Sequence, residues 1–114
     1  MKDFNGNISY NGKDYPVVFN LNVMEKIQDE YGSLDKWGKM TDLSGEPNAK
    51  AVLFGLTEMI NEGIDIQNEN NGTDEPFLTK KQVGRIVTEI GLAKATKTLN
   101  ETVIESTRSS EKNS

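Results

Sequence analysis

The first twenty residues alternate between apolar and polar side chains, and this pattern predicts a β-hairpin. Strict alternation over residues 3–10 is typical of a half-buried strand. Asn11 and Gly12 follow, and both tolerate the positive φ angles of a type I′ turn. Because folding at that turn places apolar residues on one face, turn and pattern agree on a hairpin over residues 3–20. The expected cross-strand pairs are Phe4 with Phe19, Gly6 with Val17, Asn7 with Pro16 and Ile8 with Tyr15.

The rest of the chain carries apolar residues at helical spacing, which predicts helices that each pack one face on a core. Two strands alone are marginally stable in water, so we expect the helices to cover the apolar face of the hairpin. The predicted fold class is α+β, a two-stranded antiparallel hairpin packed on a small bundle of about four helices. One domain is expected over residues 1–107, followed by a polar tail at 108–114. The helices are expected at about 22–32, 33–40, 47–62 and 79–107.

Capping residues and glycines mark the expected helix ends. Asn22 can cap the first helix, with Glu25 three residues on, and Thr79 with Gln82 forms a capping box for the last. Gly63 is the expected end of the third helix. The other expected boundaries are Gly32 and Ser33 between the first two helices and Pro47 at the first position of the third.

The last predicted helix has two apolar stripes on roughly opposite faces, which change over at Gly91. A straight helix with one partner cannot bury both stripes, so two compatible solutions are open. The chain breaks or kinks near Gly91, or the C-terminal half buries its stripe against something else. The first stripe is Val83, Ile86, Val87 and Ile90, and the second is Leu92, Ala95, Leu99 and Val103.

The second stripe is the candidate partner-binding surface, because apolar surface left over from the core suits an amphipathic helix of another protein. Self-association through the same stripe is an alternative and would compete with a client. Phe54 is out of phase with its own helix and belongs either to a second packing surface within the fold or to the partner contact. Trp37 is interpreted as a core residue. The predicted partner-binding residues are Leu92, Leu99, Val103, Ile104 and Phe54.

Composition changes the picture mainly by excluding chemistry. The 114 residues contain no cysteine and no histidine, which removes disulfides and thiol chemistry and leaves zinc sites and the usual catalytic triads only in rare variants. No glycine-rich phosphate loop is present, and acidic pairs such as Asp29-Glu30 are interpreted as surface charges. We therefore expect no enzyme, no cofactor and no metal, and no apolar run is long enough to predict a membrane span.

Residues 65–76 are rich in Asn, Gln and acidic side chains and predict an exposed acidic loop. Calcium is the specific alternative here, but the spacing of Asp65, Asn68, Asn70 and Asp74 does not match an EF-hand loop.

The last helix has a local excess of positive charge in a chain whose net charge is −5. Without interleaved aromatic residues this does not predict a nucleic-acid interface. A match to the acidic segment or to an acidic partner is favoured instead. The basic residues are Lys80, Lys81, Arg85, Lys94 and Lys97.

The order of these features resembles the small tail assembly chaperones of long-tailed phages that infect Gram-positive bacteria, often found as prophages. The resemblance rests on short segments: the turn Asn11-Gly12-Lys13-Asp14-Tyr15, then Phe19-Asn20-Leu21-Asn22, Tyr31-Gly32-Ser33 and Leu78-Thr79. It covers most of residues 7–92, and the long acidic segment departs from it.

This resemblance implies a non-catalytic protein of the bacterial cytoplasm. Such chaperones bind the phage tape measure protein in many copies and keep its long helical, apolar stretches soluble until the tail tube forms around it. The alternatives are a minor structural tail or head–tail connector protein and a small regulatory binding domain.

Overall fold

The N-terminal hairpin forms in the register that its turn predicts. The computed structural model describes residues 5–112, and in it β1 (Asn5–Tyr10) and β2 (Lys13–Val18) pair antiparallel. Asn11 and Gly12 both have positive φ, as a tight hairpin turn requires. The predicted contact of Phe4 lies outside the described residues. The confirmed pairs are Gly6 with Val17, Asn7 with Pro16 and Ile8 with Tyr15.

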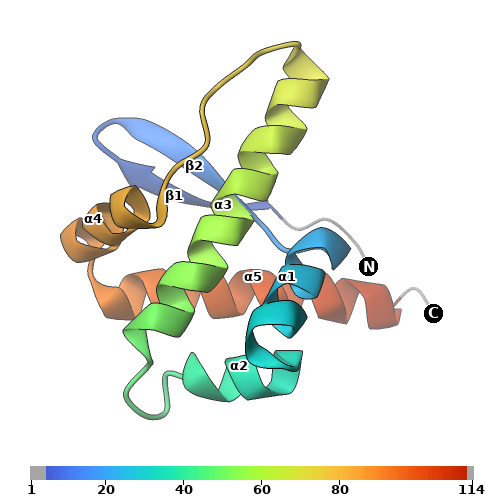
Figure 1. Ribbon diagram of the computed structural model, residues 1–114, viewed down its shortest axis with the longest axis vertical. Helices are drawn as coiled ribbons and strands as arrows, with labels where there is room; N and C mark the ends of the chain where they lie inside the picture. The colour runs from blue at the N-terminus through green and yellow to red at the C-terminus, as the bar shows by residue number, and fades with distance from the viewer. Residues whose placement is uncertain (1–4, 113–114) are drawn as a thin grey trace.

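Five helices follow the hairpin within the described residues, so the fold is α+β with a helical majority. The third helix runs diagonally across the molecule, between the hairpin side and the first two helices (Figure 1). It contacts β2 and all four other helices, which makes it the central element of the core. The helices are α1 (Leu21–Tyr31), α2 (Leu34–Met40), α3 (Ala49–Asn71), α4 (Lys80–Ile90) and α5 (Leu92–Lys112).

The first helix begins two residues earlier than its predicted cap would place it. Asn20, not Asn22, is the N-cap of α1, because its side-chain oxygen accepts a hydrogen bond from the backbone N–H of Val23 at 3.2 Å. Asn22 lies inside the helix, where its amide donates to Glu62 on α3 at 3.0 Å. Asn20 and Asn22 lie two positions apart and are equally good caps by residue type, so the tertiary partner decides between them.

The second helix begins where Gly32 and Ser33 predict, and it carries Trp37 into the core as expected. Ser33 caps α2, and Gly32 ends α1 with a φ of 90°. Trp37 is buried, and its indole Nε1 donates to the carbonyl oxygen of Ala51 at 3.0 Å. Burial of the ring with its only polar atom satisfied makes Trp37 a core residue.

Both predicted ends of the third helix are wrong. Pro47 lies before the N-cap, which is Asn48, and the helix does not end at Gly63 but continues to Asn71. Gly63 is present for a different reason. An ideal Cβ at this position would lie 2.7 Å from the Cβ and Cγ atoms of Pro16, so the missing side chain lets α3 approach β2 closely.

The extension of α3 converts about half of the predicted acidic loop into helix. The helix stops at Gly72, which has a φ of 63° in the left-handed region. The amide side chain of Asn68 then holds the returning chain, since it donates to the carbonyl oxygen of Glu75 and accepts from the N–H of Glu75 and the hydroxyl of Thr73. The loop proper is therefore shorter than predicted, over residues 72–79.

The predicted break at Gly91 is confirmed and separates α4 from α5. Thr79 and Gln82 form the predicted capping box of α4. Gly91 has a φ of 98°, and its N–H donates to the carbonyl oxygen of Val87 at 2.8 Å. The change of direction brings both apolar stripes onto one core. The helix α5 continues to Lys112, beyond the predicted boundary at 107, so the first five residues of the predicted polar tail, 108–112, are helical.

Candidate partner-binding surface

The predicted C-terminal stripe is mostly internal, which corrects its assignment as a free surface. Leu99 is fully buried in the core. Leu92 and Val103 are half-buried and pack against the same core, and only Ile104 is substantially exposed, at 50%. The reason is the break at Gly91, which turns α5 so that its stripe faces the hairpin and α3.

Phe54 belongs to a second packing surface within the fold. Its ring packs edge-to-face on Tyr31, with ring centroids 5.5 Å apart and an interplanar angle of 76°. Burial of Tyr31 raises the pKa of its phenol, and the nearby Glu30 carboxylate raises it further. This contact joins α3 to α1 and leaves Phe54 half-buried. The structure therefore supports the interpretation of Phe54 as part of a second packing surface within the fold.

Phe77 is an exposed aromatic residue that the sequence analysis missed. Its side chain is 55% exposed, although it immediately precedes the half-buried Leu78. The side chain of Asn61 on α3 forms two hydrogen bonds with the backbone of Leu78. Its oxygen accepts from the Leu78 N–H at 2.8 Å, and its nitrogen donates to the Leu78 carbonyl oxygen at 2.9 Å. The loop beside Phe77 is thereby fixed to α3. Phe77 lies outside any helical stripe, so periodicity gave no signal for it.

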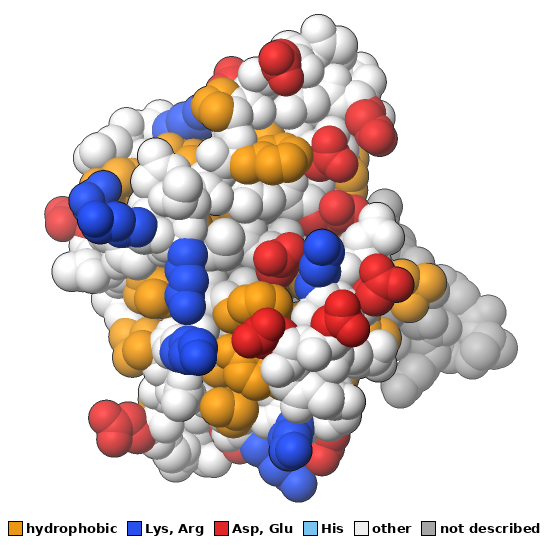
Figure 2. Space-filling model, viewed as in Figure 1, with side chains coloured by type: hydrophobic (Ala, Val, Ile, Leu, Met, Phe, Trp, Pro, Cys, Tyr) orange, Lys and Arg blue, Asp and Glu red, His pale blue; other side chains and the backbone are white. Residues whose placement is uncertain are grey.

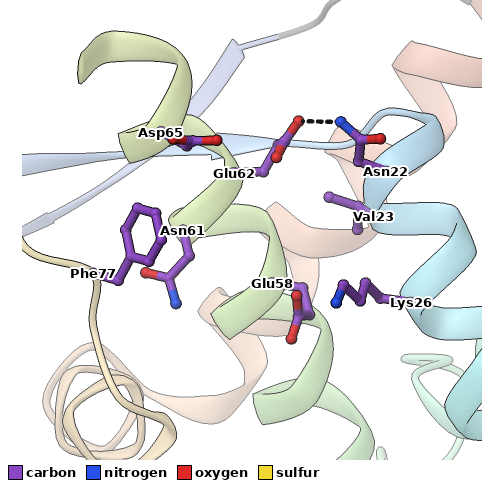
Figure 3. Close-up of a pocket in the computed structure, with 8 residues that line it drawn as sticks. All are labelled: Asn22, Val23, Lys26, Glu58, Asn61, Glu62, Asp65 and Phe77. Carbon is purple, nitrogen blue, oxygen red and sulfur yellow. Dashed lines mark hydrogen bonds between the residues drawn. The ribbon is translucent and has the colours of Figure 1, made fainter. Parts of the chain in front are cut away.

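A hollow opens beside Phe77, between α1 and α3 (Figure 3). We call it the acidic groove. Three carboxylates line it from one face of α3, because their spacing of four and then three residues places them in a row along the helix. The residues that line the groove are Asn22, Val23 and Lys26 of α1, Glu58, Asn61, Glu62 and Asp65 of α3, and Phe77 of the loop.

Hydrogen bonds hold one of these carboxylates in place. Glu62 accepts from the side-chain amide of Asn20 at 2.7 Å and from that of Asn22 at 3.0 Å. Lys26 reaches from α1 toward Glu58 on the opposite wall (Figure 3). One ammonium group against three carboxylates leaves the groove negative, so it favours a cationic ligand.

A second hollow lies where α4 meets α3, and we call it the basic hollow. Leu53 of α3 and Tyr10 of β1 contribute apolar surface to it, and basic side chains of α4 surround it. At Gly84, which also lines it, an ideal Cβ would make only an ordinary contact with the Cδ1 atom of Leu53, at 3.8 Å. The α4 residues that line it are Lys80, Lys81, Gly84, Arg85, Thr88 and Glu89.

The two charge types are separated across one broad face of the molecule. Figure 2 shows Lys and Arg side chains gathered toward the left of this face, where α4 lies, and Asp and Glu side chains concentrated over α1 and α3. Apolar side chains lie between them. The face is thus suited to binding a macromolecule that carries acidic groups opposite its basic part and basic groups opposite its acidic part.

The described residues bear on two other classes of site. Among the side chains that the structure describes, residues 6–107, no group of three or more acidic residues is arranged to hold a metal ion. No helix in that part of the chain is both long enough and apolar enough to cross a membrane. Comparisons with protein-family models, with curated proteins and with solved structures found no match for the chain.

Proposed function

We propose that this protein is a non-catalytic phage tail assembly chaperone that binds the tape measure protein and keeps it soluble in the cytoplasm of the bacterial host. The observation that carries the proposal is the acidic groove with Phe77 exposed at its side. An aromatic anchor beside a row of carboxylates suits an amphipathic helix with apolar and basic positions. We propose the tape measure protein as the client because the chain resembles tail assembly chaperones, which bind it.

The groove replaces the C-terminal stripe as the client site in this proposal. Leu99 is buried, so it does not contact a client while the domain is folded. Phe77 is exposed and needs no rearrangement before it contacts a client. Ile104, in the C-terminal half of α5, is also half-exposed and is a further apolar side chain that a client can contact without rearrangement.

Weak contacts suffice for such a function when they are repeated. A long client that offers many similar helical segments binds many copies of a small protein, and each bound copy covers apolar surface that would otherwise aggregate. Linked sites on one client raise the total binding strength well above that of one contact.

Co-expression with the neighbouring long helical reading frame tests the proposal. We expect the wild-type protein to move the client into the soluble fraction and to co-purify with it. Phe77→Asp is expected to abolish both effects while the monomer stays folded, because the side chain is exposed. Leu43→Asp is the matched control, since Leu43 is also an exposed hydrophobic residue, at 43%, but lies in the loop between α2 and α3.

Two results would overturn the proposal. One is a client that stays insoluble in the presence of the wild-type protein. The other is the presence of this protein in finished phage particles, detected by mass spectrometry, because an assembly chaperone leaves before the particle is complete. That second result would support a minor structural tail or head–tail connector protein instead.

A further inference from the structure

The acidic groove and the basic hollow are neighbours on either side of α3. Leu53 lines the basic hollow and Glu58 lines the acidic groove, five residues further along the same helix. The loop provides a second connection, since Phe77 lines one hollow and Lys80 the other. The two hollows therefore lie close together and carry charges of opposite sign. Basic and acidic side chains likewise occupy different parts of the face in Figure 2.

Among the side chains that the structure describes, residues 6–107, no charged residue of either hollow forms an ion pair, although Lys26 is directed toward Glu58. Lys13 pairs with Glu75 and Lys39 with Asp35, and none of these four residues lines either hollow. Lys80 opens α4, whose first turn contains no acidic residue, so the helix dipole adds to the positive potential there. An external group with complementary charge would gain from both ends of the surface.

We infer that this face binds a second copy of the same chain, with α4 of each copy seated against the acidic groove of the other. A twofold axis that lies in the plane of the interface, at right angles to the line between the two hollows, exchanges the two ends of the face. Each basic hollow then meets an acidic groove, and both contacts form at once. Phe77 and Leu53 then lie within the interface and supply apolar contact between the charged ends.

The dimensions of the molecule fit such a pairing. The principal extents are 36 × 36 × 23 Å, so the molecule is flattened. Figure 2 views the molecule along its shortest axis and therefore shows one of its two broad faces. A stable interface buries about 800 Å² on each partner. A face of this size provides that area with room left at its rim.

The pairing has a consequence for the client site, which rests on the proposed function. The second copy covers the same acidic groove that the client uses. Dimer and client complex then exclude one another, so the groove stays covered until a client displaces the second copy.

A charge-swap experiment with the purified full chain tests the dimer without any client. Sedimentation equilibrium measures the dissociation constant of the wild-type protein at low and high salt. Lys80→Glu with Arg85→Glu makes both hollows acidic, and Glu58→Lys with Asp65→Lys makes both basic. We expect each double variant to dimerise about tenfold more weakly or worse, since like charges then face one another. Mixing the two variants restores both opposite-charge contacts, so a heterodimer is expected.

The matched control is Lys94→Glu with Lys97→Glu, which changes the net charge as much as the first variant does. Both lysines are exposed on α5 and line neither hollow. We expect this control to dimerise as the wild type does. Circular dichroism checks that every variant is folded, and a wild-type dimer that weakens with salt supports the inference even where a variant does not fold.

The inference is overturned by a wild-type protein that stays monomeric at all concentrations, by a control as weak as the charge-swap variants, or by a mixture that forms no heterodimer. These results are separate from the test of function. A monomeric protein that still solubilises its client removes the dimer and leaves the chaperone proposal standing. A protein that dimerises but does not solubilise the client removes the chaperone proposal and leaves the dimer standing.

Discussion

Replacing Gly63 by alanine is expected to destabilise the protein, although alanine is the better helix former. Gly63 lies in the interior of α3, where the change by itself favours the helix by about 1 kcal/mol. The new Cβ would lie 2.7 Å from two ring carbons of Pro16 and 3.3 Å from its carbonyl oxygen. Favourable carbon–carbon contacts begin near 3.5 Å. A proline ring and a backbone carbonyl cannot rotate away, so α3 must move off β2.

The magnitude follows from setting these two effects against each other. Overpacking of a core costs about 1–3 kcal/mol, and the rigidity of the contacted atoms argues for the upper part of that range. After the gain in helix propensity, we expect Gly63→Ala to lower the free energy of unfolding by about 1–2 kcal/mol. For a domain of this size that is a fall in Tm of several degrees.

Gly84→Ala provides the matched control. Gly84 also lies inside a helix, α4, but its new Cβ would meet only a carbon of Leu53 at 3.8 Å, an ordinary contact. This variant is expected to raise the free energy of unfolding by about 0.4–1 kcal/mol. Urea unfolding followed by circular dichroism at low protein concentration measures both variants without a contribution from self-association.

The two substitutions are therefore expected to change stability in opposite directions. If Gly63→Ala stabilised the protein as much as Gly84→Ala does, the close packing of α3 on β2 would be refuted. Gly63 would then have no packing role in the fold.

Three further measurements test the core, a cap and a surface charge. Leu99→Ala is expected to lower the free energy of unfolding by about 2–5 kcal/mol, and Ile104→Ala by less than about 0.5 kcal/mol; similar losses would contradict the burial of α5. Asn20→Ala removes the cap of α1 and is expected to cost about 1 kcal/mol in urea unfolding, whereas an unchanged midpoint would reject that cap. The backbone N–H of Ser44 donates to the Asp42 carboxylate and holds its pKa below the usual value. Its contribution to stability is thus present above the ordinary pKa and is lost as the pH falls through the lowered one. An NMR titration midpoint at or above the ordinary value would contradict this.

Local signals predicted the ends of several elements correctly. The Asn11-Gly12 turn determines the hairpin register through its backbone angles, and the alternating pattern agrees with it. The capping box at Thr79 and the break at Gly91 also depend on residues close by in the chain. Such interactions involve only a few neighbouring residues, so they can be predicted from the sequence without knowledge of the fold.

The predictions were wrong where the role of a residue depends on a contact with a residue far away in the chain. Gly63 looks like a helix stop in sequence, yet it serves the approach of Pro16, which lies 47 positions earlier in the chain. Asn22 looks like a cap, yet it bonds Glu62 across the helix pair. For each residue, two uses are compatible with its chemistry, and only the packing partner selects one.

The candidate surface shows the same division. The apolar character of Leu99 is plain in the sequence, but its burial follows from the direction in which α5 leaves Gly91. Phe77 belongs to no apolar stripe, so the sequence gives no sign that it is exposed. Its exposure is known only from the structure, in which Asn61 fixes the adjacent backbone of Leu78 to α3.

The sequence by itself determined the α+β class, the hairpin register, the residues that cap α2 and α4 and the break before α5, because each depends on backbone angles and near neighbours. Tertiary structure alone decided which stripe is buried, how far α3 runs, and that acidic and basic side chains share one broad face. Those outcomes depend on how rigid helices pack against one another, and that geometry is set by contacts between residues far apart in the chain.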